Sequence, residues 1–261
     1  MSFVRSFPAL AAYVLCARDV LAVDAFEIQV YDGTANRPGV PGLELHVNRV
    51  FDGTKTSEPP ELPLHHQTHL TLEPSLGVTP FLELGGYLQT AFRADGTFDY
   101  AGTKLRAKFV TPEGWRENVR LGVNLELSVI PERYEASRWG AEIRPIAAWE
   151  NELWLFAINP IVGVPLTSDP TPEFEPAAMA KVKLLKVVAL GVEYYSSFGR
   201  VSAPSPWHEE LQYLYEAVDV LNLPHVEINA GVGEGLTAAS NAFVAKCILG
   251  YSWERDTPGT P

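Results

Sequence analysis

The sequence has few cysteines, a deficit of positive charge and no long apolar run. Its two cysteines, Cys16 and Cys247, are too few for a disulfide framework in a chain of 261 residues. The 20 basic residues against 32 acidic ones give a net charge of −12, which argues against nucleic acid as a partner because phosphate binding needs a basic surface. No stretch of about eighteen uncharged apolar residues occurs, so a membrane-spanning helix is not expected.

What the sequence does contain is a series of short segments in which every second residue is apolar. The clearest examples are residues 121–129, 139–149 and 243–253. A period of two is typical of β-strands, and these apolar faces have about the length that a tilted strand needs to cross a bilayer. Charged residues such as Glu126 and Lys246 lie on the opposite faces. The pattern predicts an all-β fold, a transmembrane antiparallel up-and-down β-barrel with a polar lumen.

About twelve strands are expected, an even number, as single-chain bacterial barrels require. The predicted strands are 43–50, 65–78, 81–92, 99–110, 119–130, 138–149, 152–165, 174–185, 187–198, 211–221, 225–235 and 241–253. The connections between them alternate between short turns and longer loops rich in Pro, Gly, Asp and Glu. Short inner turns with longer outer loops are typical of outer-membrane barrels.

Four regions of the chain are predicted. Residues 1–25 have the features of a signal peptide, with Arg5 in the positive region, an apolar stretch at 7–17 and a cleavage site before Phe26. Residues 26–42 are interpreted as a periplasmic or lumen-associated segment, 43–253 as the barrel and 254–261 as a tail.

Two strands leave a different architecture open. Residues 152–165 are apolar on both faces, as in a buried strand of a soluble sandwich. In 211–221, Asp219 shares a face with Tyr213 and Tyr215, which a lipid-facing surface tolerates only near a membrane edge. A soluble β-sandwich or lipid-binding β-protein is therefore the architectural alternative.

Projecting the alternation inward gives a set of charged residues that line the lumen. They are Glu73, Glu83, Arg106, Lys108, Glu126, Glu142, Arg144, Lys181, Lys183, Glu193, Glu227 and Lys246. Acidic and basic members are balanced, and charges held away from water must be paired. Such charges either hold the lumen together or set the selectivity of a pore, and both roles are compatible.

Aromatic residues gather near the predicted strand ends, as in the interfacial girdles of membrane barrels. The predicted girdle contains Trp139, Trp149, Trp154, Tyr213, Tyr251 and Trp253. Ordinary aromatic packing at strand ends is the alternative.

No motif predicts a catalytic residue, a metal site or a cofactor. His65 and His69 would lie about 13 Å apart along a strand, too far to bind one ion. Residues 231–235 are rich in glycine but lack the helix and the Lys-Ser/Thr of a phosphate-binding loop. A Gly-x-Ser-x-Gly elbow is also missing from the sequence.

Four segments of the chain form a recognisable set: EIQVY at 27–31, GLELH at 42–46, EPSLGVT at 73–79 with FLELG at 81–85, and the hairpin from Lys181 to LGVEYY at 190–195. These segments resemble one known family, the outer-membrane barrels named for the meta-pathway of phenol degradation. The resemblance covers most of the chain from residue 26. It implies an outer-membrane barrel and a channel for small apolar or aromatic compounds, and it carries over no catalytic residue.

The sequence therefore predicts a protein of the bacterial outer membrane that passes small solutes passively. Its expected partners are outer-membrane lipid, a small-molecule solute and the barrel-assembly machinery. A structural or surface-interaction barrel without transport is the alternative function, and an outer-membrane hydrolase is a less favoured one.

Overall fold

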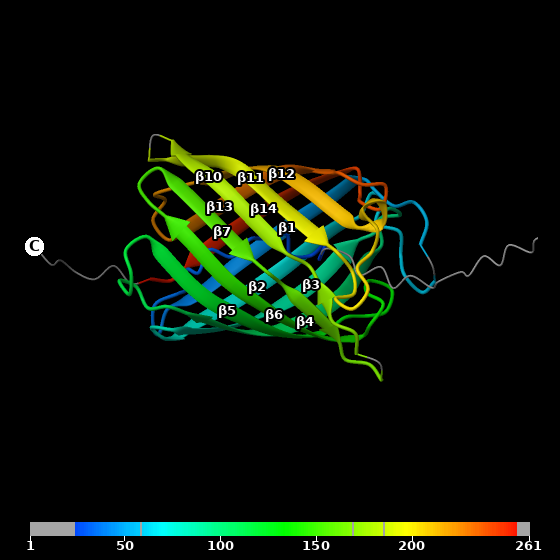
Figure 1. Cartoon of the computed structure of the whole chain (residues 1–261), viewed down its shortest axis with the longest axis horizontal. Coiled ribbons are helices and arrows are strands. Elements are labelled where there is room, and N and C mark those ends of the chain that lie inside the picture. Colours follow the sequence, from blue (N-terminus) through cyan, green and yellow to red (C-terminus); the bar gives the residue numbers. More distant parts are fainter. Residues whose placement is uncertain (1–23, 58, 169, 185, 255–261) are drawn as a thin grey trace, which may run out of the picture.

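The structure is a computed structural model that describes residues 24–57, 59–168, 170–184 and 186–254 (Figure 1). Most of the predicted signal peptide and nearly all of the predicted tail lie outside the described residues. Among those described, no helix is long and apolar enough to cross a membrane, and the one helical turn is η1 (Trp207–Glu209).

Fourteen strand segments form a single antiparallel sheet whose hydrogen-bonded order returns from β6 to β5, so that the sheet closes into a barrel (Figure 1). The segments are β1 (Pro41–Asp52), β2 (Thr68–Thr79), β3 (Leu82–Phe92), β4 (Phe98–Val110), β5 (Val119–Val129), β6 (Trp139–Glu150), β7 (Trp154–Asn159), β8 (Val162–Pro165), β9 (Glu173–Phe174), β10 (Ala177–Leu184), β11 (Val188–Ser197), β12 (Leu211–Val220), β13 (Val226–Gly235) and β14 (Phe243–Ser252). Closure of the sheet confirms the predicted fold class.

Two of the wall strands are interrupted, each at a proline. β7 and β8 both pair with β6 and are separated at Pro160, whereas β9 and β10 pair with β8 and β7 and are separated at Pro176. Proline has no backbone N–H to donate to a ladder, so a strand breaks or bulges there. Counting each interrupted strand once gives the predicted twelve wall strands.

Connections of two kinds alternate along the chain, as predicted. The short ones follow β2, β6, β10 and β12 and, together with the longer connection after β4, lie at one end of the barrel, which we call the short-turn end. Asn118, Lys186 and Asn222, with φ near +60°, lie in these turns, and asparagine enters this conformation more readily than most residues. The longer connections lie at the opposite, long-loop end.

The wall is apolar outside and polar inside. On β5, Leu121, Leu125 and Leu127 are 40%, 41% and 59% exposed, whereas Asn124 and Glu126 between them are buried. In a bilayer the leucines would meet hydrocarbon, where an arginine costs about 2–4 kcal/mol. β6 and β14 repeat this arrangement, with Arg144 and Lys246 buried inside.

β12 presents the face opposite to the one expected. Tyr213 and Tyr215 are buried in the lumen, and Leu214 and Glu216 face outward. The prediction of Tyr213 as an interfacial aromatic is therefore wrong. The physical reason is space: a Cβ on Gly233 of the neighbouring β13 would lie 2.4 Å from the Tyr215 ring, so glycine makes room for an inward tyrosine.

Candidate functional site

The lumen is occupied by the chain that precedes β1. Residues 24–40, which we call the lumen segment, enter at the long-loop end and leave at the short-turn end, where β1 begins. Phe26, Glu27, Ile28, Val30 and Tyr31 are each at most 7% exposed. These buried residues therefore lie among the inward side chains of the wall.

Wall side chains satisfy the backbone of the lumen segment. Asn159 on β7 does so twice, because its Oδ1 accepts from the Tyr31 N–H at 2.7 Å and its Nδ2 donates to the Tyr31 carbonyl at 2.9 Å. Thr71 donates to the carbonyl of Phe26, and Lys246 to that of Ile28, both at 3.0 Å. Buried backbone groups need such partners, so the segment lies in one defined register.

One side of the lumen is apolar and aromatic. Ile28 and Val30 of the lumen segment belong to a buried cluster with Met179, Tyr195 and Tyr215. The inward-facing residues of β7 also belong to this apolar cluster. This is why the strand is apolar on both faces.

The other side of the lumen is a network of ion pairs. Arg106 of β4 donates to Glu73 at 2.7 Å and to Glu83 at 2.8 Å. Arg144 of β6 contacts Glu27 of the lumen segment at 3.2 Å and Glu142 at 2.8 Å. Because charges with so little access to water need partners, these pairs fix both the wall and the segment.

The lumen segment completes this network. Tyr31 donates to Glu27 at 2.9 Å, and its hydroxyl lies 2.6 Å from that of Tyr87. The Arg144 guanidinium lies 4.5 Å from the centre of the Tyr31 ring. Lys104 contacts Asp24 at 2.5 Å, which joins the start of the segment to β4.

The structure places the twelve predicted lumen residues on inward-facing positions. Eight are buried, and they are Glu73, Glu83, Arg106, Glu126, Arg144, Lys181, Glu193 and Lys246. Lys108, Glu142 and Lys183 are partly exposed inside, and Glu227 lines cavities at the short-turn end although much of it is accessible. Whether these residues govern passage of a solute stays a prediction.

Sequence analysis missed several members of the site. Lys104 shares its face with Arg106 and Lys108, so the alternation alone could have found it. Asp219, which contacts Lys181 at 2.8 Å, was assigned to lipid with the rest of its misassigned face. Nothing local in the sequence marks Glu27 or Tyr31 as partners of the wall.

Five predicted girdle residues do lie on the outer wall near strand ends. Trp139, Trp149, Trp154, Tyr251 and Trp253 are 40–54% exposed. The Tyr251 and Trp253 rings lie 5.1 Å apart, edge to face. Aromatic rings at these heights suit the two interfaces of a membrane.

Of the cavities that border the lumen segment, two lie beside its buried part. The larger, 280 Å³, lies toward the short-turn end and is lined by Tyr31, Glu44, Arg106 and Lys181 among others. The smaller, 140 Å³, lies toward the long-loop end. The two cavities therefore border different parts of the segment, the smaller one beside residues 24–26 and the larger one beside residues 29–34.

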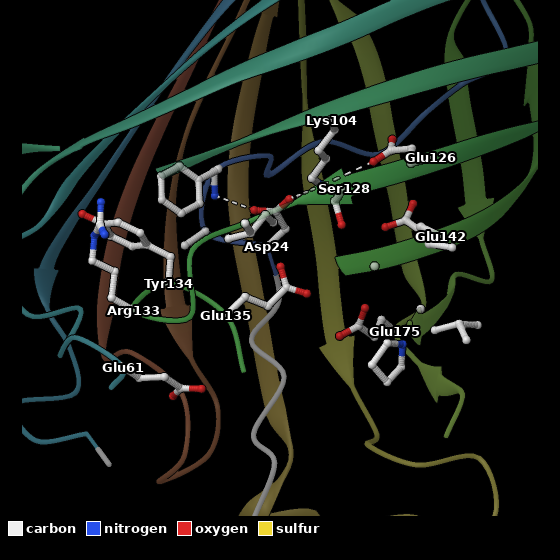
Figure 2. A pocket seen from close by; sticks show the side chains of 18 of the residues that line it. Asp24, Glu61, Lys104, Glu126, Ser128, Arg133, Tyr134, Glu135, Glu142 and Glu175 are labelled. Carbon is white, nitrogen blue, oxygen red and sulfur yellow. Dashed lines mark hydrogen bonds and ion pairs between the residues drawn. The ribbon is translucent and has the colours of Figure 1, made fainter. Parts of the chain in front are cut away.

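The smaller chamber is acidic, and Figure 2 shows the carboxylates of Glu135, Glu142 and Glu175 directed into one space. Lys104 reaches it from above and pairs with Asp24 and Glu126. Burial raises the pKa of Glu135, in the loop before β6, from its usual 4.5 to about 7, although Lys104 opposes the shift.

The structure does not bring His65 and His69, the histidines singled out by the sequence, together at one site. His65 and His66 lie in the loop before β2, whereas His69 points into the lumen and contacts Gln67 at 3.0 Å. One group in the described part of the chain has the spacing for an ion, namely Glu44, His46 and Glu73. The glycines at 231–235 lie in β13 and form no phosphate-binding loop.

No family model and no curated protein matches the sequence. Among solved structures, the COG4313 outer membrane channel from Pseudomonas putida F1 is similar, with a TM-score of 0.59 and 11% identity over 87% of this chain and 100% of that one. The outer membrane channel DcaP of Acinetobacter baumannii matches with a TM-score of 0.36 and 8% identity over 85% and 100%. The first similarity shows that this chain has the fold of an outer-membrane β-barrel.

Proposed function

We propose that this protein is a passive outer-membrane channel for a small apolar or aromatic solute, with the lumen segment as its movable plug. The observation that carries the proposal is a closed barrel with an apolar outer wall, whose lumen is filled by residues 24–40 and holds two chambers beside them.

The apolar side of the lumen supports the choice of solute. When the lumen segment moves, Ile28 and Val30 leave a surface made of Met179, Tyr195 and Tyr215. Tyrosine rings offer flat contact to an aromatic solute and a hydroxyl at the edge. The resemblance to barrels named for phenol degradation points to the same class of compound.

The charged side of the lumen supports passive passage of a neutral solute. Arg106 and Lys108 are matched by Glu73 and Glu83, and Lys181 and Lys246 by Glu193 and Asp219. Because the two signs neutralise each other locally, this wall attracts neither anions nor cations strongly.

The attachment of the segment is suited to release. From Ala25 to Tyr31 its hydrogen bonds to the described wall come from side chains such as Asn48, Thr71 and Asn159 rather than from a strand ladder. Each such neutral bond contributes about 0.5–1.5 kcal/mol and can exchange for water, so the ion pairs of Glu27 with Arg144 and Lys104 are the stronger contacts that release must also break.

Conductance and solute uptake test the proposal. We expect the wild type to show small, rare openings in planar bilayers, and a variant lacking residues 27–36 to conduct at least tenfold more. A variant lacking residues 202–204, which are exposed in the loop before β12, serves as the control. Liposome swelling with phenol-sized neutral solutes should follow the same order.

Absence of conductance from both the wild type and the variant lacking residues 27–36, together with normal uptake in a deletion strain, would exclude the channel. A barrel whose loops bind a surface partner would then be the better interpretation. Neutralising Arg144 or Lys181 separates the two functions further, because only a channel would respond in its conductance.

A further inference from the structure

Two carboxylates and one imidazole meet on the inner faces of neighbouring strands β1 and β2. Glu44 and Glu73 lie directly opposite each other in the register, and His46 follows Glu44 by two residues on the same face. Opposed residues of this kind have Cβ atoms only about 5 Å apart, so their side chains converge.

The ligand atoms have the spacing of a coordination sphere. His46 Nε2 lies 3.1 Å from Glu73 Oε2 and 3.4 Å from Glu44 Oε2, and the three atoms all lie within 4.8 Å of one another. Metal–ligand bonds of about 2.0–2.1 Å at tetrahedral angles place neighbouring ligand atoms about 3.3 Å apart. An ion therefore fits between these atoms with small side-chain movements.

Hydrogen bonding alone leaves the group incompletely satisfied. His46 is fully buried, and its Nε2 is the ring nitrogen that faces both carboxylates, whereas Nδ1 has no hydrogen-bond partner among the described residues and would stay outside the coordination sphere. A neutral ring with a proton on Nε2 can donate fully to only one of the two carboxylates. A bound cation would be coordinated by His46 Nε2 and by one oxygen of each carboxylate at the same time.

Neighbouring groups orient the carboxylates and leave the inward oxygens available. Arg106 Nε holds the other oxygen of Glu73, Oε1, at 2.7 Å. Gln29 Nε2 of the lumen segment lies 3.3 Å from Glu44 Oε2, a long contact that an ion could displace. Outer contacts of this kind fix the direction of metal ligands.

The group is also open to the short-turn end. The Glu44 side chain is 23% exposed and lines both the 280 Å³ cavity and a 300 Å³ cavity beside Ser252. Gly250 of β14 provides the room, since a Cβ there would lie 3.3 Å from Glu44 Cγ. An ion could enter by this route and keep water as a further ligand.

We propose that Glu44, His46 and Glu73 form a binding site for one divalent first-row metal ion, with Zn²⁺ as the best match. One nitrogen and two oxygen ligands plus water is a set that Zn²⁺ accepts, whereas Ca²⁺ and Mg²⁺ prefer oxygen alone. Metal binding at this site does not require conduction, so the metal-site proposal can be tested separately from the channel proposal.

Zinc titration of the purified full-length barrel in detergent, after removal of metal, tests the site. We expect one zinc ion per chain by calorimetry, and at least a tenfold loss of affinity in His46→Gln and in Glu44→Gln. His69→Gln is the matched control, because His69 is equally buried in the lumen but contacts Gln67 and the Ala25 carbonyl instead of carboxylates.

The titrations are carried out in a His65→Gln/His66→Gln background, since these loop histidines near Asp52 could bind zinc at the surface. Heat-modifiable migration on a gel verifies that each variant is folded, and Glu44→Gln, which changes a partly exposed side chain, serves if His46→Gln does not fold. The proposal is overturned if zinc does not bind saturably in this background, or if it binds equally well to folded Glu44→Gln.

Discussion

Lys246 of β14 donates a hydrogen bond of 3.0 Å to the backbone carbonyl of Ile28, and so ties the barrel wall to the segment inside it. The same ammonium is paired with Glu193 of β11. One buried side chain therefore connects two distant wall strands and the lumen segment.

Replacing this lysine should weaken both the barrel and the plug. Lys246→Met leaves the Glu193 carboxylate with Lys181 as its remaining cation and removes the donor to Ile28. Breaking a buried ion pair costs about 3–5 kcal/mol, and we expect a loss of this order in urea unfolding. Lys55→Met, at an exposed pair with Asp52, should cost less than about 1 kcal/mol. Equal losses in both variants would contradict the role of Lys246.

Asn159 should control how firmly the lumen segment is held. Asn159→Leu removes two buried hydrogen bonds to the Tyr31 backbone, so the segment loses about 1–3 kcal/mol of attachment. Hydrogen exchange at residues 26–31 should become about tenfold faster or more. Asn124→Leu is the control, because Asn124 is just as buried but donates to Glu126. Unchanged exchange in Asn159→Leu would show that other contacts hold the segment.

The sequence predicted the wall much better than the contents of the lumen. Alternation assigns a face to each residue, and in β5 and β6 the apolar face carries no charge, so the assignment was clear. In β12 each face carries one acidic residue, Glu216 or Asp219, so charge does not tell which face points into the lumen. The orientation depends on the space beside Gly233, which belongs to the neighbouring strand β13.

The side-chain partners that meet across the lumen could not be predicted from the two-residue alternation of the strands. Alternation places Arg144 inside but does not say that its partner is Glu27, which lies 117 residues earlier in the chain. The grouping of His46 with Glu44 and Glu73 could not be predicted for the same reason, since these residues become neighbours only through the β1–β2 register.

The acidic chamber should make stability depend on pH. The pKa of Glu135 is raised to about 7 in the folded protein, so folding favours the protonated carboxyl. Its stabilising effect is complete below about pH 4.5 and is lost as pH rises through about 7. We expect the urea midpoint of wild type to fall between pH 5 and pH 8 more than that of Glu135→Gln. Glu132→Gln, at an exposed position of the same loop, should retain the wild-type profile. Parallel profiles for wild type and Glu135→Gln would refute the prediction.

Glu216 provides a test of which face of the wall meets lipid. It is exposed on the outer side of β12, where its ladder neighbours Val192 and Val232 are 43% and 45% exposed. A carboxylate on the lipid face is unfavourable, although less so than a basic residue, so Glu216→Val should stabilise the barrel in lipid vesicles by up to about 2 kcal/mol. The same change on the inner face, Glu126→Val, removes a partner of Lys104 and should destabilise it. Unfolding by urea in vesicles measures both variants. Destabilisation by Glu216→Val would mean that this side chain has a partner outside the barrel, and the outer face of β12 would then be a contact surface.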